Sequence, residues 1–520
     1  MFKLPTLLTR VLDQVVEPVG SIQPIRRTVS RVAINHYAYS AAPRPRPLSM
    51  AADYSSWLSL NDRSYSGRHL PPADPVAHAA LPAEAAVTAL FRREREIPSS
   101  DTSVLFMFFA QWFTDSFLRT SREDFRKNTS NHEIDLCQIY GLTEAKTCLL
   151  RSLQGGRLKS QIIDGEEYPA FLFKPRQPGA PMVFKDEFVG LHDEDFITQV
   201  ILGDAPDERK DSVFAVGLEH GNSTIGNTIL NIVFLREHNR VAGVLQLEHP
   251  DWDDERLFQT TRNILIVLLL KLVVEEYIKH IAPFDFPVEM VPFIADGERW
   301  NRSNWIAIEF NLLYRWHSLV PDFLGNGSDR LDPGNFRNNN PLVMSLGVEA
   351  LIRQCSQQRA GKIGLCNTPT FLTDRWHPDL PSVQERSISL MRNARLRSYN
   401  DYREAFNLKR LTRFDQLTSD TKLCERLQAI YKDIDQLEWY VGIFAEDYGE
   451  FQMMGELMTT MVAYDAFTQA LTNPLLARHV FNEATFTKTG LELIEATDCF
   501  QQILARNSGS PSAAYASFSC

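Results

Sequence analysis

Apolar residues recur at helical spacing along most of the chain from about residue 86 onward, and this pattern constrains the fold more than any other feature. Alternation typical of strands is scarce and short. Candidate helices span 104–120, 225–245, 253–281, 304–318, 341–360, 380–397, 421–432, 434–448 and 450–472. The sequence therefore predicts a mainly α protein, and its 44% hydrophobic residues over 520 positions are enough for a large core.

Several other classes of protein are excluded. The seven cysteines show no CxxC spacing, which excludes a zinc ribbon and a dense disulfide module. The longest apolar run, 264–270, is followed by Lys271 and predicts a buried helix, not a membrane span. A formal net charge of −11 and the lack of a long Lys/Arg run argue against a nucleic-acid partner.

The N-terminal region differs in charge from the rest of the chain. Residues 1–50 carry seven basic and two acidic side chains, whereas the remainder is acidic. Apolar residues at helical spacing in 1–20 indicate an amphipathic helix, which either lies in a membrane interface or packs on its own protein. We expect 1–50 to be a basic, membrane-binding segment, and the Ser/Ala-rich residues 507–520 to be a flexible tail.

Three short stretches place polar side chains in apolar helices. Gln111 and Asp115 are four residues apart and share one helical face, where a carboxylate needs a partner or a task. Tyr314 and His317 are three apart, so both can face one cavity; histidine is a common metal or haem ligand, although a lone one is more often an ordinary core residue. The charged run 236–240 predicts a buried ion-pair network.

Longer strings carry a resemblance to a known family. They follow one another over roughly residues 50–475 and include DYSSWLSLNDRSYSGRHLP, FFAQWFTDSF, FLREHNRV, IAIEFNLLYRWHSLVPD and YKDIDQLEWY. In these strings the chain resembles the haem-dependent cyclooxygenases and their fatty-acid dioxygenase relatives, within the animal-type haem peroxidases. The resemblance implies one large helical catalytic domain, residues 51–506, with haem b between a distal and a proximal helix.

The resemblance also implies roles for individual residues. His317 matches the proximal haem ligand, Tyr314 the tyrosine whose radical abstracts a hydrogen atom, and Gln111 the distal glutamine. The other matches are Tyr277 (hydrogen bond to the radical tyrosine), Tyr440 (near the proximal side), Phe310, Leu313 and Trp316 (top of the acyl channel), and Arg31, less closely Arg27 (carboxylate-binding arginine).

The chain departs from the family pattern at several positions. Asp115 replaces the distal histidine, and because an aspartate with its usual pKa of ~3.9 is a weaker base, we expect weak or altered peroxidase activity. Phe284 stands at the channel mouth in place of a tyrosine, and Ala466 in place of the acetylatable serine. Val462 replaces a small glycine at the channel bend, which favours a straight substrate over the folded one that cyclisation requires.

The leading hypothesis is a haem-dependent fatty-acid dioxygenase. A Tyr314 radical would take a hydrogen atom from the lipid, and the carbon radical would trap O2 to give a hydroperoxide. The alternatives are a haem peroxidase, peroxygenase or hydroperoxide-converting enzyme that uses Asp115 as acid and base, and a haem-binding lipid carrier. Since family relatives are often dimers on one membrane leaflet, we expect a homodimer with peripheral membrane contact; the sequence leaves a membrane surface or the cytoplasm open as the compartment.

Overall fold

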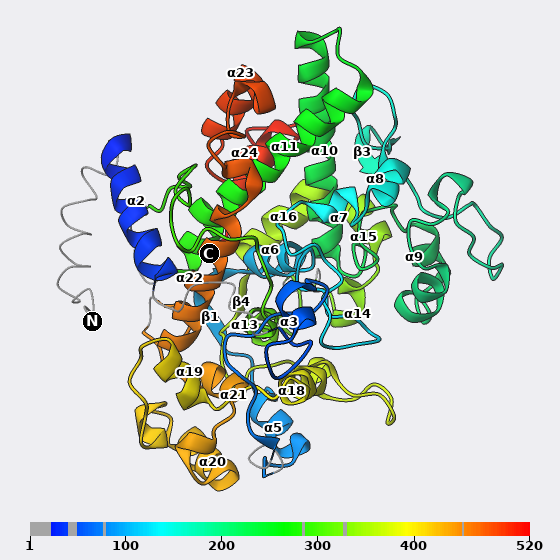
Figure 1. Cartoon of the computed structure of the whole chain (residues 1–520). Coiled ribbons are helices and arrows are strands. Elements are labelled where there is room, and N and C mark those ends of the chain that lie inside the picture. Colours follow the sequence, from blue (N-terminus) through cyan, green and yellow to red (C-terminus); the bar gives the residue numbers. More distant parts are fainter. Residues whose placement is uncertain (1–21, 40–48, 76–79, 283–286, 326–329, 450–451) are drawn as a thin grey trace.

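The structure is a computed structural model that describes residues 22–39, 49–75, 80–282, 287–325, 330–449 and 452–520. Helices form most of its regular structure (Figure 1). Within the described residues, strands form two antiparallel two-stranded sheets: β1 (Pro98–Ser103) with β4 (Arg359–Gly361), and β2 (Ser160–Ile163) with β3 (Glu166–Pro169). These observations confirm the predicted mainly α class.

The helices are distributed along the whole described chain (Figure 1). Up to residue 281 they are α2 (Gln23–Ala38), α3 (Trp57–Asn61), α5 (Glu84–Phe91), α6 (Val104–Thr114), α7 (Cys137–Tyr140), α8 (Glu144–Leu150), α9 (Asp207–Asp211), α10 (Ile225–Glu248), α11 (Asp254–Leu272) and α12 (Ile278–Ile281). After it they are α13 (Ile308–Leu313), α14 (Pro333–Phe336), α15 (Asn340–Leu346), α16 (Val348–Gln357), α17 (Thr370–Thr373), α18 (Val383–Asn393), α19 (Tyr399–Ala405), α20 (Thr421–Tyr431), α21 (Trp439–Ala445), α22 (Glu456–Leu471), α23 (Glu483–Glu495) and α24 (Phe500–Arg506).

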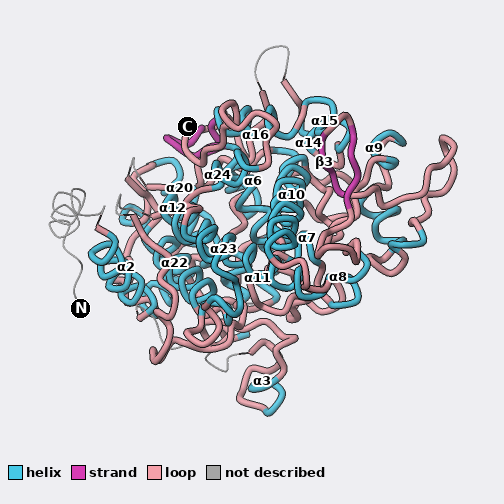
Figure 2. Tube along the Cα trace, turned by 90° about the horizontal axis from the view of Figure 1, so that it is seen from above, coloured by secondary structure: helices cyan, strands magenta, loops and turns pink. Residues whose placement is uncertain are grey.

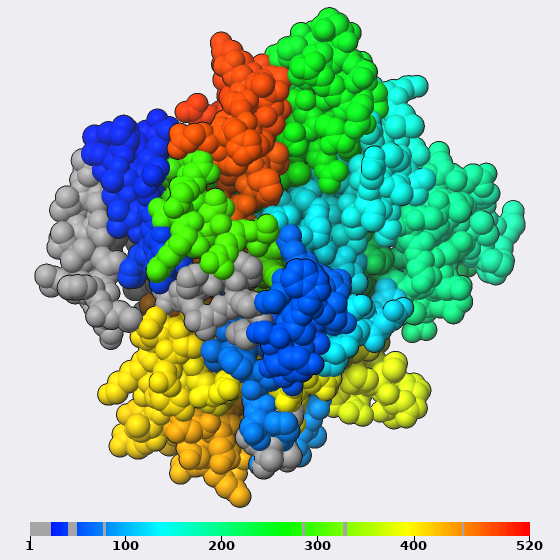
Figure 3. All heavy atoms as spheres, viewed as in Figure 1, coloured from blue at the N-terminus to red at the C-terminus, as the bar shows by residue number. Residues whose placement is uncertain are grey.

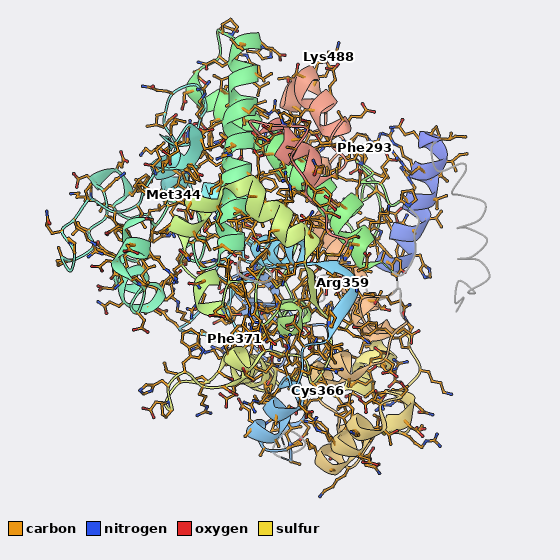
Figure 4. The ribbon with its side chains drawn as sticks, turned by 180° about the vertical axis from the view of Figure 1, so that it is seen from behind. Phe293, Met344, Arg359, Cys366, Phe371 and Lys488 are labelled. Atoms are coloured by element: carbon orange, nitrogen blue, oxygen red, sulfur yellow. The ribbon has the colours of Figure 1, made fainter. Side chains whose placement is uncertain are left out.

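Helices α10 and α11 lie near the middle of the view in Figure 2, and α23 packs along α11. Most of α10 is buried around its circumference, as expected for a helix in the middle of a large core. The continuous helical stretch 254–281 is the one described helix long and apolar enough to cross a membrane, and 83% of its apolar window is buried inside the protein. This burial confirms the prediction of a core helix around 264–270, and side chains fill the space between the helices (Figure 4).

Helix α6 crosses α10 at close range. Gly226, in the first turn of α10, makes the crossing possible because a Cβ there would overlap the ring of Phe108. One turn after Phe108 on α6, the Trp112 ring stacks on Phe234, about two turns after Gly226 on α10, with centroids 4.7 Å apart, and its indole N–H donates to Asn231 Oδ1 at 2.8 Å. The crossing therefore brings the C-terminal end of α6 against the beginning of α10.

Several predicted helices are shorter than expected, and one is divided. The predicted helix 304–318 is only Ile308–Leu313, and the chain then leaves helical geometry before a short 3-10 turn begins at His317. The predicted helix 341–360 is divided at Gly347, whose φ of 83° ends α15 and starts α16.

The predicted ion-pair network in α10 is confirmed. The Glu237 carboxylate is fully buried and accepts hydrogen bonds from Arg240 at 2.8 Å, Arg506 at 2.8 Å and Asn507 at 2.7 Å. Burial would raise the pKa of Glu237, but these donors hold it below its usual value. The network ties α24 to the centre of the fold.

Part of the C-terminal segment 507–520 is packed on the protein, so the prediction that all of it is a flexible tail is wrong. Phe518 is only 4% exposed, and its ring lies 4.9 Å from that of Phe109 in α6. The Ser517 N–H donates to the Ser356 hydroxyl at 3.1 Å. The Ser/Ala-rich composition hides the one aromatic ring that anchors this segment in the core.

We predict that Phe518→Ala lowers the free energy of unfolding by about 3–5 kcal/mol, because it empties a buried site. Tyr515→Ala is the matched control: Tyr515 lies in the same segment but is 42% exposed, and the substitution should cost ~0.5 kcal/mol or less. Urea denaturation of both variants measures the difference, and equal effects would contradict the packing of this segment.

Candidate functional site

The segment after α13 carries the two residues that the sequence placed at one cavity. Tyr314 is the C-terminal cap of α13, and His317 begins the 3-10 turn His317–Leu319. The predicted helix 304–318 would have carried both residues, but the backbone changes direction between them. They remain close in the chain, and Trp316 between them packs against Tyr314 with ring centroids 4.9 Å apart.

His317 is held by an amide from α18. Its Nδ1 lies 2.8 Å from Gln384 Oε1, so Nδ1 donates its proton and Nε2 carries the lone pair. Burial lowers the pKa of His317 to about 4, with the Gln384 hydrogen bond opposing the shift. The imidazole is therefore neutral near pH 7, the state that a metal ligand needs.

Tyr440 in α21 lies beside the same segment. Its hydroxyl donates to the Arg315 carbonyl at 3.2 Å, and its ring stacks on Phe91 with centroids 5.5 Å apart. Burial raises the pKa of Tyr440 to about 12, and Arg315 and Gln384 oppose this shift. The structure thus places Tyr440 next to the amide that holds His317.

A closed series of ring contacts, here called the aromatic loop, contains both candidate tyrosines of the channel. Neighbouring rings in it have centroids 4.9 to 6.3 Å apart. In order its members are Tyr314, Phe310, Phe117, Phe113, Tyr277, Phe106 and Trp316. The surroundings of the two phenols are therefore almost entirely apolar.

Tyr277 owes its position to a local irregularity. The helical stretch 254–281 changes to a π turn over Val273–Tyr277, a rare geometry that often marks functional sites. The hydroxyls of Tyr277 and Tyr314 are buried, and neither has a hydrogen-bond partner within the described residues, so the predicted hydrogen bond between them is not formed. Burial raises the pKa of both phenols, and Tyr314 adds to the shift at Tyr277. Both phenols therefore keep their protons near pH 7.

Gln111 and Asp115 lie at the C-terminal end of α6. The Asp115 N–H donates to the Gln111 carbonyl at 3.0 Å, which confirms that they stand one helical turn apart. Gln111 is exposed while the other residues of α6 are buried, so solvent reaches it within the core. Asp115 Oδ2 accepts from Asn227 Nδ2 at 2.9 Å. Burial raises the pKa of Asp115 to about 6, against the opposing effects of Asn227 and Arg119.

The predicted channel residues divide into two groups. Phe310, Leu313 and Trp316 are buried next to Tyr314, and Val462 and Ala466 are buried on one face of α22, which packs against α13. Phe284 lies outside the described residues.

Arg31 is not brought to this group. It is exposed on α2, at the edge of the molecule (Figure 3). Arg26 and Arg27 of the same helix bind the two oxygens of Glu289 at 2.8 and 2.9 Å, which attaches α2 to the body of the protein.

The residues around His317 fit a haem group. Three buried polar atoms there have no hydrogen-bond partner within the described residues: Tyr314 Oη, Trp316 Nε1 and Gln384 Nε2. Buried polar atoms almost always have partners, so these indicate that another group belongs in the space. A single neutral histidine, with no cluster of three His, Cys, Asp or Glu side chains in the described part of the chain, suits an axial haem ligand better than a bare metal ion.

Residues 120–516 match the family model of the animal haem peroxidases. The chain belongs to this family. Prostaglandin G/H synthase 1 of Rattus norvegicus is 34% identical over 475 residues, which cover 89% of this chain and 74% of the relative. Prostaglandin G/H synthase 2 of Gallus gallus is 32% identical over 506 residues, 94% of this chain and 78% of the relative. As a member of the family, the protein is a haem-dependent oxidoreductase.

Solved structures agree on the fold. The fatty acid alpha-dioxygenase of Oryza sativa superposes with a TM-score of 0.70 at 17% identity, covering 98% of this chain and 95% of that chain. Peroxidase A of Dictyostelium discoideum superposes with a TM-score of 0.65 at 20% identity, covering 84% of this chain and 90% of that chain. These likenesses confirm the predicted haem peroxidase-like helical fold.

The structure adds two residues that the sequence reasoning missed. Gln384 and Asn227 each lie in an otherwise ordinary helical segment, and both contact candidate site residues from far along the chain. For Asn227 the sequence holds one weak indication of its position at a helix start, because it stands three residues after Thr224, the N-cap of α10. The Thr224 hydroxyl donates to Asn227 Oδ1 at 2.7 Å and so turns the amide nitrogen toward Asp115.

We predict that Asp115→Asn stabilises the protein relative to wild type at pH 8 but not below pH ~4. The pKa of Asp115 is about 6 in the folded state and ~3.9 when unfolded, so the folded state binds the proton more tightly and loses stability as pH rises through this window. Urea denaturation of both proteins from pH 4 to 8 measures the difference. A stability difference that does not change with pH would contradict the raised pKa.

Proposed function

We propose that the protein is a fatty acid dioxygenase in which Tyr314 is the hydrogen-abstracting residue. The observation that carries the proposal is the state of the Tyr314 phenol. It is protonated near pH 7 and has no hydrogen-bond partner in the described residues. Its ring belongs to the aromatic loop, and it stands three residues before the candidate haem ligand. The names of relatives support the substrate class, since they include prostaglandin G/H synthases and a fatty acid alpha-dioxygenase solved with palmitic acid.

Haem, when bound by His317, supplies the oxidising power that removes one electron from Tyr314. The phenol loses its proton with the electron and becomes a phenoxyl radical. This radical takes a hydrogen atom from a C–H bond of the acyl chain, which restores the phenol and leaves a carbon radical. The carbon radical adds O2, and the peroxyl radical takes the hydrogen atom back from the Tyr314 phenol. This gives the lipid hydroperoxide and restores the phenoxyl radical.

The surrounding residues orient the acyl chain and exclude water. Phe310 and Leu313 are buried beside Tyr314, so a bound chain meets apolar surface where the hydrogen atom is taken. Val462 and Ala466, one turn apart on α22, provide the opposite wall in this proposal. A valine side chain at the bend favours an extended chain, which leads to a linear hydroperoxide and not a cyclic endoperoxide.

Asp115 supports a second activity, the turnover of peroxide. A carboxyl group with a pKa of about 6 exchanges its proton readily near neutral pH, which suits a general acid and base. Asn227 binds one carboxylate oxygen and fixes its orientation. Gln111, one helical turn away and exposed, is the second polar group on this side. We therefore keep peroxidase or peroxygenase chemistry as the second candidate function.

Peripheral membrane contact through residues 1–50 is part of the same proposal. Residues 1–21 and 40–48 lie outside the described chain. In the described helix α2, Ile22 just before it and Val32 within it are 48% and 64% exposed, beside the exposed Arg31. Exposed apolar side chains on a helix that carries arginines suit the surface of an anionic membrane, and in this proposal Arg31 there meets the fatty acid carboxylate. The homodimer stays a prediction.

Oxygen uptake tests the dioxygenase. We expect haem-loaded wild type to consume O2 with unsaturated or saturated fatty acids after a trace of hydroperoxide, and Tyr314→Phe to lose uptake at least 100-fold, because phenylalanine has no O–H bond to exchange. Tyr431→Phe, which changes a buried tyrosine bonded to Glu438 in another part of the fold, is the matched control and should keep full uptake. Full uptake in Tyr314→Phe would exclude the proposed role.

Peroxide consumption without fatty acid tests the second function. We expect Asp115→Ala to reduce the rate 10²- to 10⁴-fold, the usual contribution of a positioned acid or base. The wild-type rate should fall as pH drops below about 6, because the carboxylate is then protonated. Peroxide turnover that is equal in both proteins would show that Asp115 is not the acid or base.

A further inference from the structure

The neighbourhood of His317 contains a partly buried positive charge, Arg315, and neutral hydrogen-bond partners. No salt bridge of His317 or Arg315 occurs within the described residues. This arrangement differs from the rest of the fold, where Arg392 on the same helix α18 pairs with Glu438 at 2.7 Å.

Gln384 is the direct partner of the imidazole. The residue is fully buried, and its Oε1 accepts from His317 Nδ1 at 2.8 Å while its Nε2 has no partner in the described residues. A carboxylate in this place would draw the Nδ1 proton toward itself and make the ring a stronger electron donor through Nε2. An amide oxygen accepts the same hydrogen bond without that effect, so the imidazole stays a neutral and weaker donor.

Arg315 adds a positive charge to the same pocket. Its Nη1 donates to Ser387 Oγ at 3.1 Å and its Nη2 to Asn311 Oδ1 at 2.9 Å, both neutral acceptors. A guanidinium keeps its proton in proteins, so the charge persists two residues from His317. Because these acceptors do not neutralise it and the surroundings are mostly buried, the charge acts on its neighbours with little screening.

We propose that Gln384 and Arg315 are positioning residues: Gln384 orients His317 through its hydrogen bond, and both residues raise the reduction potential of a bound haem. The proposal rests on haem ligation by His317. A weaker donor and a nearby positive charge both disfavour the more oxidised iron, so both raise the potential. A higher potential suits the proposed function, because the bound group must take an electron from Tyr314.

The test is a potentiometric titration of the Fe(III)/Fe(II) couple in the haem-loaded full chain, without substrate. Gln384→Glu keeps the shape of the side chain and adds a carboxylate, and we expect it to lower the midpoint potential and to raise the iron–histidine stretching frequency in resonance Raman spectra of the ferrous protein. Gln384→Met removes the acceptor and should lower that frequency. Arg315→Gln should lower the potential, whereas Arg315→Lys, which keeps the charge, should restore most of it.

Each outcome has a defined meaning. An unchanged potential and Raman band in Gln384→Glu, at a haem content equal to that of wild type, would overturn the role of Gln384. Equal potentials in Arg315→Gln and Arg315→Lys would overturn the role of Arg315. If wild type itself shows no haem spectrum that His317→Ala abolishes, haem ligation by His317 fails first, and that result is separate from these comparisons.

Discussion

The close crossing of α6 and α10 is the contact on which the arrangement of the site depends. It requires a glycine, since any side chain at position 226 would collide with the Phe108 ring of α6. The approach lets Trp112 bond Asn231 and brings Asp115 to Asn227. The same helix α6 contributes Phe106 and Phe113 to the aromatic loop around Tyr314. One backbone approach thus positions the carboxylate side and the radical side of the site together.

Buried charged groups are compensated in the scaffold and left weakly compensated in the site. In the scaffold the buried Glu237 is matched by two arginines and an asparagine, which hold its pKa down. In the site, Asp115 and His317 meet mainly neutral amides, so burial decides their state: the carboxyl pKa rises to about 6 and the imidazole pKa falls to about 4. Paired charges stabilise the fold, whereas these weakly compensated groups are the ones suited to exchanging protons or binding iron.

Much of the fold and of the candidate site was accessible from the sequence. The long apolar stretches predicted α10 and the helical stretch 254–281, because a helix buried on all sides needs apolar residues over its whole length. The strings around Gln111, Tyr314 and His317 indicated the family. The residue pattern gave a wrong prediction where the chain bends. It predicted one helix that includes Tyr314 and His317, although the helix ends at Leu313. The composition of the last residues also gave no sign that Phe518 is buried, since one aromatic residue hardly changes a Ser/Ala-rich composition.

The sequence by itself determined the helical class, the family and the identities of the ligand and tyrosine candidates, because these depend on periodicity and on short strings of residues. Only the tertiary structure decided what surrounds them. Gln384 reaches His317 from 67 positions away, and Asn227 reaches Asp115 from 112 positions away. Such partners are brought together by helix packing, and no local pattern records which distant side chain will meet which. Their burial, and hence their pKa values, follows from the same packing.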